Sequence, residues 1–365
     1  MIDRLISMIL AGLCCLGLTA PAAVPAAVDA PAVSANAALS LERTITYSDV
    51  PADHWSASSV NRATALGLFQ GVGENTFGRG QPISRAAFVT ALVRLFGWEA
   101  VSPEGRFEDV PDGKWYASAV ETALANEALV SGSRAFRPEE AITREEMASM
   151  IVRGLGYASL APMAAELGTP FDDVTLNEGF IAIAYDMGLI SGMEDGRFAP
   201  GETATREQAA AVLARLYERW YAESQRVSAD SYGEQLIIPA PEASLETGMP
   251  VTPPEPMAEL YEALRRARRD GLYMDGLVLR LTAGGVRTVV SGGEIAESGP
   301  ITAAEVRELL DSGANDYYST RYESAYCIYQ PNAYQTATVW YQSEESMAAK
   351  LQLARMFGVT KYSLV

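Results

Sequence analysis

Histidine and cysteine are nearly absent from this chain of 365 residues. It contains one histidine, His54, and three cysteines, two of which, Cys14 and Cys15, lie in the apolar stretch at the N-terminus. One histidine cannot form a catalytic or metal-binding cluster, and Cys327 alone cannot form an internal disulfide. We therefore expect no metal site and no cofactor, and we interpret His54 as a solvated loop residue.

Basic residues are also scarce. The chain has 28 Lys and Arg against 46 Asp and Glu, so its formal net charge is -18. Binding to a phosphate backbone needs a basic face, which argues against nucleic acid as a partner. An anionic partner would have to be recognised by local arginines and backbone N–H groups in a groove. The length and the 48% hydrophobic content are sufficient for two or three packed domains.

The apolar run at the N-terminus is short. It covers residues 5–18, about 14 residues, whereas a helix needs ~20 to span a bilayer. Arg4 precedes the run, and small residues follow it as far as Ala37. We interpret residues 1–37 as a secretory signal, cleaved after Ala37 or earlier at Ala20 or Ala23, and expect no membrane span after its removal. A membrane anchor is the alternative interpretation.

The first 220 residues repeat one pattern three times. Each copy has an Asp-Val pair, an apolar stripe at helical spacing, a loop with one Phe, and a Ser/Thr-Arg pair that begins another helix. These marks are Asp49-Val50, Phe77 and Ser84-Arg85; Asp109-Val110, Phe136 and Thr143-Arg144; and Asp173-Val174, Phe198 and Thr205-Arg206. A repeat of about 60 residues indicates supersecondary units that bury their apolar faces on one another. We place the repeats at 47–103, 104–166 and 167–221.

The second helix of each copy carries a start signal. Ser84, Thr143 and Thr205 are expected N-cap residues, and Glu146 and Gln208 follow three residues after the second and third. Those two copies therefore predict capping boxes. The first copy has Ala87 at that position, so its cap should be weaker by about 0.5–1 kcal/mol.

These motifs resemble the S-layer homology family. The first copy reads Val-Pro-x-x-His-Trp, the second Phe-x-Asp-Val-Pro-x-x-x-Trp, and each second helix begins with Ser/Thr-Arg. The resemblance implies a pseudo-threefold helical domain with grooves between its units, which attaches non-covalently to a secondary cell-wall polymer, typically pyruvylated. Two copies depart from the pattern, because Leu176 replaces the tryptophan in the third and Ala86-Ala87 replaces the acidic end of the motif in the first.

The candidate polymer-binding residues come from the same marks. The three arginines lie just inside helix N-termini, where the helix dipole favours an anion, although they could instead brace neighbouring loops. The two tryptophans open apolar stripes, which favours a core position and leaves a groove edge as the alternative. The full set is Arg85, Arg144, Arg206, Trp55, Trp115, Ser84, Thr143 and Thr205.

Beyond residue 221 the character of the chain changes. Residues 222–256 are rich in proline and have little periodicity, so we interpret them as a linker. Residues 257–365 are expected to form a small α/β domain. Its expected elements are helices at 257–269, 301–312 and 343–357, two strands at 277–281 and 286–290 around a turn, a hairpin of 326–329 with 336–341, and a strand at 359–364.

The stretch from Thr338 to Val359 is similar to the closing strand, helix and strand of glycoside hydrolase family 18 barrels. That family's Asp-Gly-x-Asp-x-Asp-x-Glu motif is matched only at Asp275-Gly276, with Thr282 at the position of the acid. Glycoside hydrolysis needs a proton donor, and about 110 residues cannot close a barrel that takes ~200 or more. We predict a non-catalytic, truncated remnant without catalytic residues. Its seven crowded tyrosines, between residues 317 and 341, are either packing or a sugar-stacking platform.

The sequence therefore predicts a mainly α protein with an all-helical triple repeat and a small α/β C-terminal domain. We expect it to be secreted and held at the wall or S-layer surface of a Gram-positive-type bacterium, with a cell-wall polysaccharide as partner and no enzyme activity. The first alternative is a cell-wall glycan hydrolase of the family 18 type, or a glycan-binding accessory of one. A structural S-layer subunit is a third interpretation.

Overall fold

The computed structural model describes residues 46–221 and 228–365, except 231, 240–241 and 247. The chain divides into two compact units, a helical one that ends at Glu218 and a second one that runs from Arg219 to Val365. The signal peptide expected at residues 1–37 lies outside the described residues. Among the helices that are described, none combines the length and the apolar character that crossing a membrane requires.

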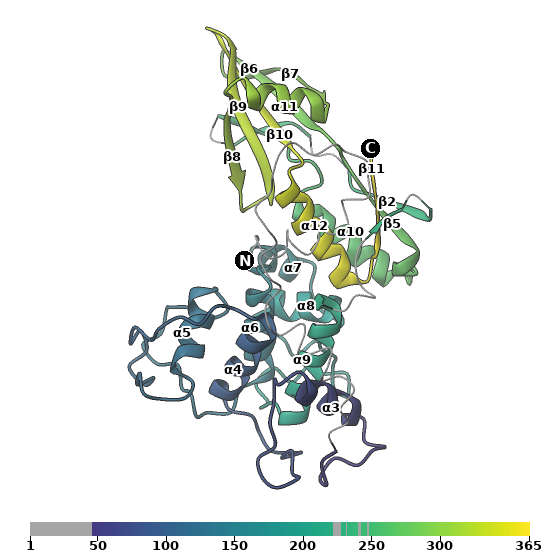
Figure 1. The fold of residues 1–365 in the computed structure, drawn as a ribbon. Helices are drawn as coiled ribbons and strands as arrows, with labels where there is room; N and C mark the ends of the chain where they lie inside the picture. The colour runs from purple at the N-terminus through teal and green to yellow at the C-terminus, as the bar shows by residue number, and fades with distance from the viewer. Residues whose placement is uncertain (1–45, 222–227, 231, 240–241, 247) are drawn as a thin grey trace, which may run out of the picture. The chain divides into compact units, whose positions relative to one another are not determined.

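Each repeat of the helical unit consists of a short helix, a loop and a second helix (Figure 1). The pairs are α3 (Ala57–Ala65) with α4 (Arg85–Phe96), α5 (Ala117–Ala125) with α6 (Arg144–Gly154), and α8 (Glu178–Asp186) with α9 (Arg206–Tyr221). A short helix η1 (Ala158–Leu160) and α7 (Ala161–Glu166) lie between α6 and α8. This order confirms the repeat that the sequence predicts.

The helix starts follow the predicted capping. Thr143 and Glu146 form a reciprocal capping box at α6, and Thr205 and Gln208 exchange the same pair of hydrogen bonds at α9. Ser84 accepts one bond from the N–H of Ala87, which cannot return a side-chain bond. The capping differences between the copies are therefore confirmed.

The loop phenylalanines form the centre of each repeat. Phe77, Phe136 and Phe198 are all buried, although each belongs to a loop rich in charged residues. Each of them packs on a second aromatic ring of its own repeat, with ring centroids 5.5–6.1 Å apart. Protein interiors are closely packed, so the buried ring of each phenylalanine fits one site in the core. This ring holds its loop in place.

The described residues of the second unit form two main sheets and three longer helices. A parallel sheet has the order β1-β11-β5-β2, and an antiparallel sheet has the order β7-β6-β10-β9-β8. The strands are β1 (Ser228–Ala229), β2 (Glu234–Ile237), β5 (Leu277–Leu281), β6 (Gly285–Ser291), β7 (Glu294–Ile301), β8 (Asn315–Ser319), β9 (Ser324–Asn332), β10 (Gln335–Tyr341) and β11 (Lys361–Leu364). The helices are α10 (Met257–Arg269), α11 (Ala303–Asp311) and α12 (Glu344–Phe357).

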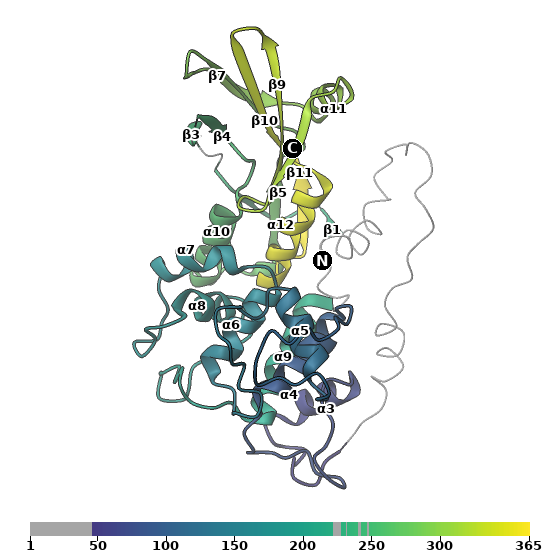
Figure 2. The ribbon, with the colours of Figure 1, turned by 90° about the vertical axis from the view of Figure 1, so that its left-hand side faces the viewer.

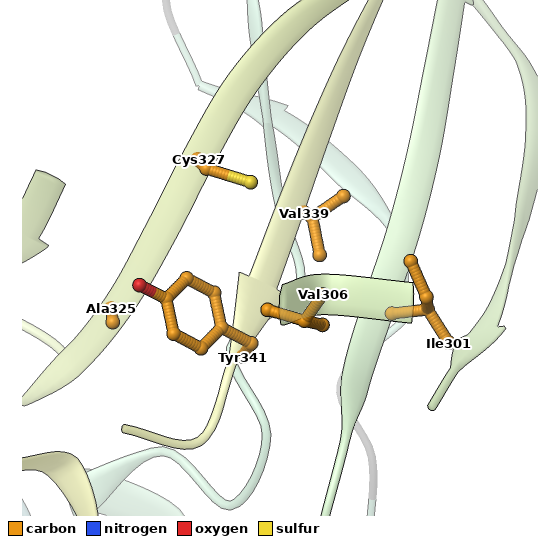
Figure 3. Packing of buried hydrophobic residues seen from close by; sticks show 6 residues of the cluster. All are labelled: Ile301, Val306, Ala325, Cys327, Val339 and Tyr341. Atoms are coloured by element: carbon orange, nitrogen blue, oxygen red, sulfur yellow. The ribbon is translucent and has the colours of Figure 1, made fainter. Parts of the chain in front are cut away.

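One face of the antiparallel sheet carries a core with α11. Val306 of this helix packs on Ile301, Cys327, Val339 and Tyr341 (Figure 3). Burial raises the pKa of the Cys327 thiol to about 11, so this cysteine is a protonated core residue at neutral pH.

The other face of this sheet carries a row of aromatic side chains. Tyr317, Tyr326 and Trp340 stand on neighbouring strands and stack with ring centroids 5.2 and 4.7 Å apart. The indole N–H of Trp340 donates to the carbonyl of Pro250, which lies in β4 (Met249–Val251), a strand paired with β3 (Ser244–Glu246) (Figure 2). These contacts favour packing over an open sugar platform.

The helices and strands expected after residue 257 are present, with one difference in pairing. The strands at 277–281 and 286–290 do not pair with each other, because β5 belongs to the parallel sheet and β6 to the antiparallel one. Gly284 and Gly285 allow this change of sheet, since a Cβ at either position would lie about 2 Å from the carbonyl of Ile301 or Trp340.

The segment interpreted as a linker takes part in the second unit. Strand β2 pairs in parallel with β5, β1 pairs with β11, and β3 with β4 forms a small hairpin. Strands β7 and β8 were also not predicted. The helical unit and the α/β class of the second unit are as expected, but the chain as a whole is less dominated by helices than the expected mainly α class. The sequence missed β7 and β8 because they are polar edge strands without a period of two in hydrophobicity.

Candidate functional site: grooves between interlocked repeats

A ring of backbone hydrogen bonds joins the three repeats. The residue before each N-cap is extended, and its N–H donates to the equivalent residue of another repeat. Ile83 donates to the carbonyl of Ala204, Ala204 to Ile142, and Ile142 to Ile83, with N–O distances of 2.9–3.0 Å. All three residues are buried. The ring closes on itself, so every repeat contacts both others, as the pseudo-threefold arrangement requires.

The aspartate of each Asp-Val pair holds the phenylalanine loop of its own repeat. Asp173 accepts hydrogen bonds from the backbone N–H groups of Phe198 and Ala199 at 2.9 and 2.7 Å. Those N–H groups, with Phe198 the strongest, hold the pKa of Asp173 below its usual range. Asp109 and Asp49 bind the loops of Phe136 and Phe77 in the same way.

The helix-start arginines link one repeat to the next. In each case Nε donates to the carbonyl of a phenylalanine in the following repeat, and the guanidinium lies over that ring 4.7–5.1 Å from its centroid. The three pairs are Arg85 with Phe136, Arg144 with Phe198 and Arg206 with Phe77. The bracing role that we considered for these arginines is therefore present in the structure.

The remaining donors of the three arginines have different partners. Arg144 and Arg206 each direct Nη2 to one further carbonyl, that of Ser191 and of Gln70. Arg85 instead forms an ion pair with Glu146, the capping-box carboxylate of the second repeat. Glu146 of the second repeat thus neutralises the charge of Arg85.

The two tryptophans lie outside the core. Trp55 is 59% exposed and Trp115 is 65% exposed, and Leu176 at the equivalent place in the third repeat is 68% exposed. The core position favoured from the sequence is wrong for both, because each precedes its helix and projects from a turn instead of joining the apolar stripe. His54 beside Trp55 is half-buried, with Nδ1 2.8 Å from the hydroxyl of the buried Ser56, so it is not a freely solvated residue.

A cavity of about 680 Å³ opens beside Arg144, and we call it the Arg144 groove. Arg144 and Met147 of α6 form one wall, one face of α9 forms another, and Trp55 of the first repeat lies at the edge. The remaining lining residues are Ile190, Ser191, Gly192, Met193, Glu194, Asp195 and Phe198 of the third repeat. All three repeats contribute, and the lining combines two cations, two carboxylates, an indole ring and apolar side chains.

The predicted site residues thus fall into two groups. Arg144 and Trp55 line one groove together. The hydroxyls of Ser84, Thr143 and Thr205 instead cap the N-termini of α4, α6 and α9. Arg215, which also lines the Arg144 groove, was not predicted, because an arginine inside an amphipathic helix carries no local signal. Within the described ranges no group of three or more His, Cys, Asp or Glu side chains could hold a metal ion.

Three segments of the chain match the S-layer homology domain, at residues 46–89, 106–148 and 170–210. Among its relatives, an exoglucanase of Acetivibrio thermocellus is 30% identical over 185 residues, which cover 49% of this chain and 17% of the relative. The S-layer protein sap of Bacillus anthracis is 28% identical over 187 residues, which cover 50% and 22%. The chain spans less than a quarter of the length of such relatives.

The chain therefore carries three S-layer homology repeats. These repeats and the S-layer relatives indicate a secreted protein of a bacterial cell surface. Solved structures that resemble the chain include a chitinase of Chromobacterium violaceum, with 14% identity, a TM-score of 0.30 and coverage of 61% of this chain and 70% of the chitinase.

The aspartate contacts predict a loss of stability in acid. Because the pKa of Asp173 is lower in the folded protein than its unfolded value of about 3.9, its contribution is complete above that value and is lost as the pH falls through the folded pKa. We expect Asp173→Asn to lower the Tm at pH 7 and to flatten the fall of Tm between about pH 4 and pH 2. Thermal melts followed by circular dichroism measure both.

The neighbouring Asp172 provides the matched control, because it is exposed and the N–H groups of Phe198 and Ala199 donate to Asp173 instead. Asp172→Asn should leave the melting curve and its pH dependence unchanged. Equal effects of the two substitutions would show that general charge, and not the bonds to Phe198 and Ala199, sets the acid sensitivity.

Proposed function

We propose that the helical unit anchors the protein non-covalently to an anionic secondary cell-wall polymer of a Gram-positive-type bacterium, and that a pyruvylated sugar is the group bound. The observation that carries the proposal is the Arg144 groove. Its volume of about 680 Å³ lies within the range of ligand pockets, ~300–1,000 Å³, and its lining joins a buried guanidinium to an exposed indole.

The guanidinium of Arg144 is prepared for an anion. It makes hydrogen bonds to two backbone carbonyls, and within the described part of the chain it has no carboxylate partner within salt-bridge distance. Burial lowers the pKa of Arg144, although an arginine stays charged at neutral pH. Asp173 and Glu202 act on this charge from a distance, but neither forms an ion pair with it. A guanidinium without an ion-pair partner in a partly desolvated groove favours an anionic ligand, with which it forms a charge-assisted pair.

The other lining residues suit a sugar ring with an apolar substituent. Trp55 offers an indole face for stacking, and Met147, Ile190 and Val212 offer apolar surface. A ketal-linked pyruvate carries a carboxylate, which suits the Arg144 guanidinium, and a methyl group, which suits the apolar side chains. The net charge of -18 repels an anionic polymer at long range, so recognition must come from contacts inside the groove.

The three repeats do not offer three equal grooves. Trp55 and Arg144 line the same cavity. From the threefold relation of the repeats we infer that Trp115 takes the equivalent place beside Arg206, and Leu176 the equivalent place beside Arg85. The last position lacks the indole ring, and its arginine is paired with Glu146. We infer that the Arg144 groove binds most strongly, that the Arg206 groove binds more weakly, and that the Arg85 position contributes little.

This ranking predicts the effect of two substitutions on wall binding. Arg144→Ala should weaken retention of the full mature chain on wall sacculi by about 1–3 kcal/mol, more than Arg206→Ala does, because it removes a charge-assisted pair in the most complete groove. Co-sedimentation with purified sacculi measures the affinities. Sacculi stripped of their secondary polymer by acid extraction should retain none of the proteins.

Thermal melts separate binding from bracing in this experiment. Both arginines hold a phenylalanine loop, so both variants should lose similar Tm while differing in affinity. Equal binding to stripped and intact sacculi would contradict the proposal. An affinity loss that follows the Tm loss in both variants would show that the arginines hold the fold and not the polymer.

For the second unit we propose a non-catalytic module that the anchor displays. The described strands of its parallel sheet form an open sheet with β1 and β2 at its edges. Thr282, at the position of the expected acid, donates through its backbone N–H and its hydroxyl to the buried carboxylate of Glu255. Lys350 lies 4.0 Å from the same carboxylate, which supports a structural role for it.

The alternative is a glycan hydrolase of the family 18 type or a glycan-binding accessory of one, and an assay decides between them. The full mature chain should release no reducing ends from chitin oligomers or peptidoglycan above background, because Thr282 stands at the position of the proton donor and the carboxylate it contacts is buried. Turnover that a single carboxylate substitution abolishes, such as Glu255→Gln, would establish the enzyme instead.

A further inference from the structure

The Arg144 groove contains a second arginine from another helix. Arg215 lies nine residues after Arg206 on α9, and it lines the same cavity as Arg144 of α6. The other two repeats carry an arginine at the same place, Arg94 in α4 and Arg153 in α6. The three repeats therefore supply their own comparison for this position.

Arg215 is the member of this set that reaches the Arg144 groove. Its Nη1 donates to the carbonyl of Leu189 at 2.6 Å, which fixes the guanidinium next to the loop that forms the groove wall. Arg153 instead lies over the ring of Phe180, 4.3 Å from its centroid, and donates to the hydroxyl of Ser149. Arg94 is exposed on the surface.

Arg215 is not neutralised by an acid of the described chain. Among the described residues no carboxylate lies within 4.0 Å of its guanidinium, and Asp195 of the groove loop is bound by Arg197 at 2.8 Å. Two arginines thus line one partly buried cavity, together with the carboxylates of Glu194 and Asp195. Because neither arginine forms an ion pair with these carboxylates, both guanidinium groups can pair with acid groups of a ligand.

The groove is longer than one sugar. Gln208, Ala211, Val212 and Arg215 form one face of two turns of α9, which corresponds to a wall about 10 Å long. A single pyranose ring does not fill that length. A wall lined over two turns, with Arg215 at its end, suits a stretch of polymer and not only its terminal residue.

We propose that Arg215 is a second binding residue, and that the groove takes two consecutive acidic sugars, with Arg144 contacting the acid group of one and Arg215 that of the other. The inference rests on the proposed function and specifies its ligand. The ligand class is an acidic disaccharide, or an internal segment of a polymer in which neighbouring units both carry a carboxylate.

Two defined probes test this with the full mature chain. One is a hexosamine methyl glycoside with a single 4,6-pyruvate ketal, and the other is the corresponding disaccharide with a ketal on each sugar. Calorimetric titration should show that Arg215→Gln weakens disaccharide binding by about tenfold and changes monosaccharide binding by less than twofold. Arg144→Ala should weaken binding of both probes.

Matched variants separate the charge from the fold. Arg215→Gln removes the charge but keeps a side-chain N–H donor that can serve the carbonyl of Leu189. Arg215→Lys keeps the charge, so it should retain most of the disaccharide affinity. Arg153→Gln is the control from the second repeat and should leave both affinities unchanged. Thermal melts of all variants report any general loss of structure.

The outcomes distinguish the two levels of the proposal. If Arg144→Ala weakens both probes but Arg215→Gln changes neither, or changes both equally, the two-site inference is wrong and the anchoring function stands. If neither probe binds the unaltered chain, the proposed function fails and this inference fails with it. Equal losses from Arg215→Gln and Arg153→Gln would also overturn the inference.

Discussion

The helical unit depends on the hydrogen-bonded ring that Ile83, Ala204 and Ile142 form at its centre. Each of these residues is buried, so its N–H must find a partner inside the protein, and the partner always lies in another repeat. An isolated repeat would lose these bonds and would expose to water the apolar side chains that the other repeats cover. The three repeats are therefore one cooperative structure and not three separate modules.

The same constraint explains why one sequence pattern serves both the fold and the proposed site. The aspartate fixes the phenylalanine loop of its own repeat, and the arginine of the preceding repeat lies over that phenylalanine. Because the arginine is held between two repeats, its remaining N–H groups are preorganised at the groove, which reduces the entropy that binding has to offset. A substitution of one of these arginines therefore lowers both the stability and the affinity. A ligand contact is identified by an affinity loss that is larger than the Tm loss explains.

Sequence reasoning succeeded where the determinants are local. The capping boxes at Thr143 and Thr205 and the helices predicted at 257–269 and 343–357 all follow from residues within a few positions of one another. It failed where tertiary pairing decides. The exposure of Trp55, the role of Arg215 and the strand at 234–237, which pairs with 277–280, depend on partners far along the chain.

The central claim is that the Arg144 groove binds the wall polymer, and the chain's tryptophans report on it directly. In a ¹⁵N-labelled mature chain titrated with solubilised secondary wall polymer, the account predicts that the indole N–H resonance of Trp55 shifts saturably. The indole of Trp340, which is buried and bonded to Pro250, should stay unchanged. A titration in which polymer binds while the Trp55 resonance does not move, or in which only Trp340 responds, would contradict the account.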